Sequence, residues 1–151
     1  MIRETESEKW NRSRYGKPKL RYYNMFKSSL DPEDYIFLVI PRYHRSLFDQ
    51  LRAGILPLNV EIGRYRDVQL SDRLCTICNN NEVEDELHFL IHCTFYEADR
   101  RVLFNIASQS CNQFIDMDSF DKFVYLMANL QKDTIKFLVK AIFMRNASIY
   151  R

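Results

Sequence analysis

Three cysteines and one histidine lie within 19 positions of this 151-residue chain, at spacings that suit the ligands of one metal ion. Two residues separate the first two cysteines, so both thiols can point inward from one tight turn. The histidine follows after nine residues and the third cysteine after four more, which lets them close the site from a short helix. Such a set of sulfur and imidazole donors is typical of a tetrahedral structural zinc site. We predict that Zn²⁺ is bound by Cys75, Cys78, His88 and Cys93.

The fourth ligand of this site has an alternative. His92 lies directly before Cys93, and because His88 and His92 would share one face of an α-helix, they could give a Cys₂His₂ site. We favour Cys93, since a thiolate at the helix end can turn inward. Four protein ligands leave no position for a water molecule, so we expect no hydrolysis at this metal. A redox Cys-x₂-Cys couple is a further alternative, but the flanking residues lack the strand–helix pattern of a thioredoxin-like unit.

The composition favours a folded protein of a reducing compartment. With 46% apolar residues the chain can build a core, and no apolar run approaches the roughly 20 residues of a membrane-spanning helix. The first residues are charged and contain no apolar stretch of a secretory signal. These features predict an intracellular protein, nuclear or cytoplasmic, without a membrane partner. In that setting cysteines are more often thiols or metal ligands than disulfides.

Hydrophobic periodicity predicts a mainly α fold, namely a small helical domain organised around the zinc site with at most short strands. Residues 1–16 are expected to form a tail or a short helix, and residues 17–151 a single domain with a zinc-binding module at 72–100. Asn81 and Glu84 occupy the positions of a capping box before the third of the expected helices. Over residues 19–27 the periodicity fits either an extended segment or a helix, and the aromatic content favours a strand or extended segment. Residues 57–63 are expected to be a loop or short extended piece. The expected helices cover 32–40, 41–54, 83–92, 95–108, 117–130 and 132–147.

Charge is unevenly distributed along the chain, although the net charge is only +2. Residues 1–30 carry eight Lys/Arg against three Glu, whereas residues 75–100 carry six acids against one Arg. Arg forks suit phosphate oxygens and tyrosines can stack on unpaired bases, so the basic segments are candidates for nucleic-acid binding. For each arginine a surface ion pair or a stem packed on the core is the alternative role. The candidate residues are Arg42, Arg45, Arg52, Arg64, Arg66, Arg73, Tyr43, Tyr65, Lys19 and Arg21.

Several motifs flank and include the predicted zinc ligands. They are Leu51-Arg-x-Gly54, Pro57-Leu58, Glu61-x-Gly63-Arg64-Tyr65, Arg73-x-Cys75-x₂-Cys78, Val83-Glu84-Asp85-Glu86-x-His88-Phe89-Leu90-x₂-Cys93 and Tyr96-x₃-Arg100. Together they resemble the C-terminal region of non-LTR retrotransposon reverse transcriptases, most densely over residues 47–101. The resemblance implies a Cys-Cys-His-Cys zinc segment beyond a polymerase domain, which would be a partner of this chain. It also implies binding of template RNA or target DNA during target-primed reverse transcription.

No polymerase aspartate pair in a Tyr/Phe-x-Asp-Asp context and no endonuclease constellation is visible in the sequence, so we expect no enzymatic activity from this chain. The acids at 82–86 should repel phosphate, which leaves the basic segments to contact RNA or DNA. Two functions therefore remain. One is a zinc-stabilised nucleic-acid-binding module. The other is a zinc-stabilised structural or protein-interaction domain, with the acidic helix or the helices of 117–147 as its partner surface.

Overall fold

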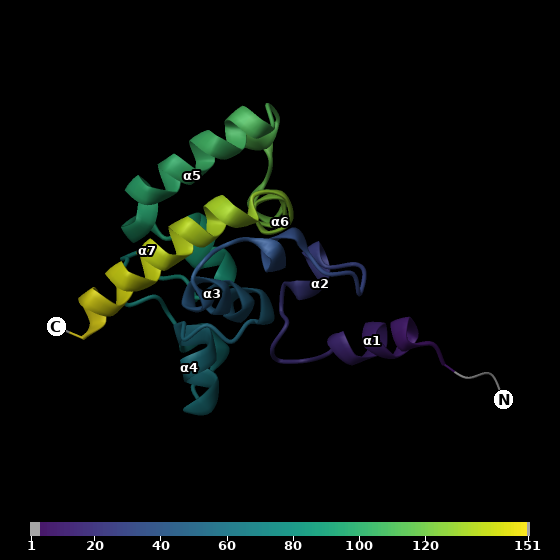
Figure 1. Cartoon of the computed structure of the whole chain (residues 1–151). Coiled ribbons are helices and arrows are strands. Elements are labelled where there is room, and N and C mark those ends of the chain that lie inside the picture. The colour runs from purple at the N-terminus through teal and green to yellow at the C-terminus, as the bar shows by residue number, and fades with distance from the viewer. Residues whose placement is uncertain (1–3, 151) are drawn as a thin grey trace.

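Helices joined by turns build the part of the chain that the structure describes, which is residues 4–150 of a computed structural model (Figure 1). Within that part, β-pairing is limited to one isolated antiparallel bridge between Leu74 and Val83. The predicted mainly α fold class is thereby confirmed. No helix there is long and apolar enough to cross a membrane. The α-helices are α1 (Glu6–Arg14), α2 (Tyr23–Phe26), α3 (Arg42–Ala53), α4 (Asn59–Tyr65), α5 (Glu97–Ser110), α6 (Ser119–Asn129) and α7 (Gln131–Ile149). Short 3-10 turns lie at Asp34–Phe37, Leu70–Asp72, Thr94–Tyr96 and Phe114–Asp116, and a π-helical turn lies at His88–His92.

Helix α7 lies at the centre of the packing and contacts α3, α5 and α6 (Figure 1). Its sequence contains no Gly or Pro, and apolar residues recur three and four positions apart, so one stripe can be buried along its length. Leu138 and Ala141 on this stripe are fully buried, as are Phe48 and Leu51 on the facing side of α3. Burying each large apolar side chain contributes about 1.5–3 kcal/mol. The predicted helices over 41–54, 95–108, 117–130 and 132–147 correspond to α3, α5, α6 and α7.

Helix α3 ends at Gly54, which has the left-handed backbone conformation typical of a helix C-terminus, with φ of +69°. A Cβ atom at this position would lie 3.2 Å from the backbone nitrogen of Leu20 and 3.4 Å from a carboxylate oxygen of Glu86. Glycine is therefore required here by both its backbone angle and the close approach of two other segments. This approach brings the N-terminal segment and the predicted zinc module against the end of α3.

The helix predicted over 32–40 is wrong. Only the short 3-10 turn Asp34–Phe37 forms, and Leu38 and Pro41 have extended backbone angles. Proline disfavours the helical conformation of the residue before it. Two tertiary hydrogen bonds hold the segment instead: the Tyr35 amide donates to the Gln131 side chain (3.1 Å), and the Arg45 guanidinium donates to the Leu38 carbonyl (2.7 Å).

The loop or extended piece predicted over 57–63 is also wrong, because residues Asn59–Tyr65 form α4. The first amide of this helix donates to the Glu84 carboxylate (2.7 Å), and the Val60 amide donates to the Glu84 carbonyl (3.1 Å). A residue far along the chain therefore satisfies the open helix end, which local sequence could not indicate. Similarly, the segment 19–27, for which an extended conformation was favoured, contains α2. Tyr22, directly before α2, and Phe26, its last residue, both pack their rings on Phe123 of α6.

Candidate metal centre

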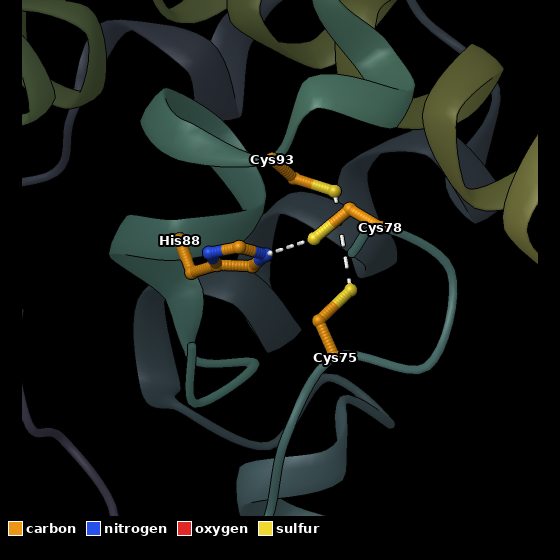
Figure 2. Close-up of side chains that lie close together, drawn as sticks. All are labelled: Cys75, Cys78, His88 and Cys93. Carbon is orange, nitrogen blue, oxygen red and sulfur yellow. Dashed lines mark hydrogen bonds between the residues drawn. The ribbon is translucent and has the colours of Figure 1, made fainter. Parts of the chain in front are cut away.

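Four side chains from two separate segments converge at one buried point, and they are the four that the spacing predicts (Figure 2). The Sγ atoms of Cys75, Cys78 and Cys93 and a ring nitrogen of His88 all lie within 4.8 Å of one another. None of the four side chains belongs to the surface, since Cys78, the most exposed, is only 7% accessible. Sequence reasoning therefore identified the members of this cluster correctly, and the cluster has the donor atoms to hold a metal ion such as zinc.

The distances within the cluster fit a tetrahedral ion rather than a disulfide. The sulfurs of Cys75 and Cys93 are 3.9 Å apart, and Cys78 Sγ lies 3.3 Å from His88 Nε2. Zn–S bonds of about 2.3 Å at tetrahedral angles place two sulfurs about 3.8 Å apart. A disulfide would need about 2.05 Å. The four donors thus already lie close to the separations that one zinc ion would impose.

A short hairpin positions the first two cysteines. The Cys75 amide donates to the Glu82 carbonyl (2.9 Å), and the Glu84 amide donates to the Arg73 carbonyl (3.0 Å). Asn81 lies in the turn with φ of +59°, a left-handed conformation that asparagine tolerates better than most residues. The bridge between Leu74 and Val83 closes the base of this turn, so that the two thiols face the same side.

A π-helical turn at His88–His92 brings the other two ligands together. The Cys93 amide donates to the His88 carbonyl (2.7 Å), which is the i to i+5 bond of a π turn. In an α-helix, with 100° per residue, positions five apart point in directions about 140° apart. The wider turn returns residue 93 to the side of residue 88, and both side chains reach the cluster. Sequence periodicity does not predict this turn, because it assumes the α-helical repeat.

His92 contacts other groups than the cluster, and this arrangement favours Cys93 as the fourth donor. Its Nε2 lies 2.8 Å from the hydroxyl of Ser119 on α6, and its Nδ1 lies 3.9 Å from Glu82. His92 is partly exposed, whereas Cys93 is fully buried. Glu82, His88 and His92 do form a second group of potential donors, but Nε2 of His88 already faces Cys78.

Glu82 orients the ring of His88. A carboxylate oxygen of Glu82 lies 2.7 Å from Nδ1 of His88, so Nδ1–H can donate to it and Nε2 is left with its lone pair toward the sulfurs. Burial lowers the pKa of His88, but contacts with the side chains of Cys75 and Glu82 outweigh it and raise the pKa to about 9, so a cation that binds Nε2 would displace a proton. Metal-binding histidines commonly use a carboxylate in this way to fix their tautomer.

The pKa values of two thiols of the cluster, Cys75 and Cys93, are shifted in opposite directions. The contact with Cys93 lowers the pKa of Cys75 far below that of an ordinary thiol, and the same contact raises the pKa of Cys93. Of this pair, Cys75 is the sulfur whose surroundings favour the thiolate form. Thiolates are the form of cysteine that binds metal ions, so this microenvironment suits a cation.

The acidic run at 82–86 connects the cluster to the rest of the protein. The predicted capping box of Asn81 and Glu84 does not form. Asp85 is the capping residue, because its carboxylate accepts from the His88 amide (2.8 Å). Asp85 also accepts from the Tyr22 hydroxyl (2.5 Å), and the buried Glu86 carboxylate accepts from the Arg21 guanidinium (2.6 Å). Each carboxylate in this run therefore binds another group of the protein, which accounts for more acidic residues than a helix cap alone would need.

The ten candidate nucleic-acid-binding residues fall into two groups. In the first group the side chains bind other parts of the protein. Those paired with or close to a carboxylate are the buried Arg52 with Glu33, Arg21 with Glu86, Arg64 with Glu61, and Lys19 at 3.9 Å from Glu61. Arg45 and Arg73 donate to backbone carbonyls. Arg52 in particular does not present its guanidinium to solvent. In the second group the side chains are exposed: Arg42, Tyr43, Tyr65 and Arg66. Most arginines of residues 42–73 therefore bind other groups of the same chain.

Two further arginines near the cluster have roles that sequence reasoning did not assign. Arg145 of α7 forms a buried pair with Glu84, with bonds of 2.8 and 2.7 Å. Arg100 of α5 is buried and donates to the carbonyls of Leu90 and Cys93. Arg100 belongs to the Tyr96-x₃-Arg100 motif, which was a signal that could have singled it out.

No protein-family model, curated protein or solved structure matches this chain, so its function is inferred from the arrangement of its own residues.

Proposed function

We propose that this chain is a zinc-stabilised helical domain in which Cys75, Cys78, His88 and Cys93 hold one structural Zn²⁺. The observation that carries the proposal is the buried convergence of three sulfurs and one imidazole within 4.8 Å. Soft sulfur donors with imidazole favour zinc over the oxygen-seeking Mg²⁺ and Ca²⁺. Because all four positions of a tetrahedral ion would be filled by the protein, the ion has a structural role and leaves no site for activating water.

Metal analysis of protein purified without chelator tests this proposal directly. We expect one zinc per chain in the wild type. The Cys93→Ser variant should lose zinc, whereas His92→Gln should keep it, because His92 contacts Ser119 rather than the cluster. A wild-type protein without bound metal would refute the proposal, and zinc loss in the His92 variant alone would move the fourth ligand to that histidine.

A second candidate function is binding of single-stranded nucleic acid at a surface patch that we name the Tyr65 patch. It consists of the exposed Tyr65 and Arg66 and the partly exposed Lys19 and Arg64, both of which lie beside Glu61. The Tyr65 ring is 68% exposed. The guanidinium carbon of Arg64 lies 4.3 Å from the ring centroid, and the Lys19 ammonium lies 6.0 Å from it. An exposed ring among cations offers a stacking surface for a base and charges for its phosphates. The resemblance to the C-terminal region of reverse transcriptases supports RNA or DNA as the partner, without polymerase or nuclease activity in this chain.

Salt dependence tests this second function. Affinity for a single-stranded oligonucleotide should fall steeply between about 50 and 200 mM salt, because phosphate contacts release counterions. Tyr65→Ala should weaken binding by about tenfold or more through lost stacking. Arg101→Gln, which removes an exposed charge on a different helix, should leave binding unchanged. Absence of affinity for RNA and DNA at low salt would reject nucleic-acid binding and leave the structural or protein-interaction domain.

A further inference from the structure

Arg100 differs from the other buried arginines of the described chain. Arg52 and Arg145 each pair with a carboxylate, and Arg14 lies over the ring of Trp10 at 4.1 Å. Arg100 is only 6% exposed and has neither kind of partner. The two acids before it on the helix pair with other cations, Asp99 with Lys140 and Glu97 with the exposed Arg101. A buried cation without a counter-charge is costly, so an anion has to be sought near it.

The hydrogen bonds of Arg100 lead to the candidate metal centre. Its Nε donates to the carbonyl of Leu90 (2.9 Å), and its Nη2 donates to the carbonyl of Cys93. Leu90 lies in the π turn and Cys93 directly follows it, and Cys93 is itself a member of the cluster. The Arg100 guanidinium therefore binds the backbone of Cys93, whose sulfur would carry negative charge as a metal ligand.

We infer that Arg100 is the counter-charge of the metal centre, and that the centre carries a net charge of −1, with three thiolates and a neutral imidazole around a divalent ion. This inference rests on the proposed zinc site. A Cys₂His₂ centre would be neutral with the same ion and would leave Arg100 uncompensated. Arg100 is a positioning residue: it acts on the ion through the backbone of Cys93 and through its charge, without being a ligand.

Zinc competition titrations against a chelating dye test the inference with four proteins: wild type, Arg100→Gln, Arg100→Lys and Arg101→Gln. Glutamine keeps hydrogen-bonding capacity but removes the charge, and we expect zinc affinity to fall by about 10–100-fold, as for other residues that support metal ligands. Lysine keeps the charge, and we expect a loss of less than about tenfold. Arg101→Gln removes the neighbouring exposed charge and should match the wild type.

The energy of the sulfur-to-cobalt charge-transfer absorption in Co²⁺-loaded protein provides a readout that a purely structural role would not move. Removing a nearby positive charge raises the energy of the sulfur electrons, so the band should shift to longer wavelength in Arg100→Gln and return toward the wild-type position in Arg100→Lys. Equal affinity and band position in Arg100→Gln and wild type would overturn the inference. So would a lysine variant as weak as the glutamine variant, or failure of both to fold. A wild type that binds no zinc would refute the proposed function itself.

Discussion

Chelation of the metal is expected to unfold most of the described chain, not only the segment that carries the ligands. Structural zinc contributes about 10–16 kcal/mol in small peptide sites, whereas a whole domain is stable by only about 5–15 kcal/mol. The residues between and beside the ligands also supply the core, because Phe89, Leu90 and Tyr96 are fully buried. Loss of the ion would release these side chains from the packing against α7, so unfolding should spread beyond residues 72–100.

Far-UV circular dichroism during titration with a chelator, followed by zinc addition, measures this effect. Cys75→Ser and Cys78→Ser should resemble the chelated protein even with zinc present. Cys111→Ser is the matched control, because Cys111 is a free, partly exposed cysteine outside the cluster, and it should leave unfolding unchanged. Retention of the wild-type melting temperature by the Cys75 variant would show that the fold does not depend on a metal.

The candidate metal centre could be predicted from sequence because its members lie close together in the chain. Ligand spacing within 19 positions limits which side chains can meet, whatever the surrounding fold. The long helices α3, α5, α6 and α7 were predictable for a similar reason, since their apolar stripes recur with the helical period. The choice of Cys93 over His92 was correct as far as the convergence of side chains goes, but the π turn that produces it has no periodic signal.

The remaining errors come from partners that are distant in sequence. The start of α4 is held by Glu84, which lies 25 positions from Asn59, and Tyr35 is held by Gln131, 96 positions away. The carboxylate that pairs with each arginine could not be predicted for the same reason, since Glu33, for example, lies 19 positions from Arg52. A charged residue's role therefore follows from the tertiary pairing, which composition and local pattern do not contain.

After loss of the metal, disruption of the buried pair of Glu84 and Arg145 is expected to lower the stability of the fold most. Both side chains are at most 3% exposed, and two hydrogen bonds of 2.8 and 2.7 Å join the cluster's hairpin to α7 across 61 positions of sequence. Arg145→Ala should lower the free energy of unfolding by about 3–5 kcal/mol, because it leaves the Glu84 carboxylate buried without a counter-charge. Glu84→Ala should cost at least as much, since the Asn59 amide then loses its acceptor as well.

Denaturant unfolding of Glu84→Gln, Arg145→Met and the double variant, measured beside Arg145→Ala, forms a double-mutant cycle that separates the pairing from simple loss of volume. The double variant Glu84→Gln/Arg145→Met removes both charges together while glutamine still accepts from the Asn59 amide, and it should recover most of the stability lost in Arg145→Ala. The exposed pair of Glu97 and Arg101 is the control, and its disruption should produce no measurable change. If Arg145→Ala proved as mild as this control, the hairpin would have to be held by the metal and the apolar contacts alone. A large loss in the single variant and a small one in the double variant would instead show that the hairpin is fastened to α7 by a charge pair that neither segment can leave unpaired.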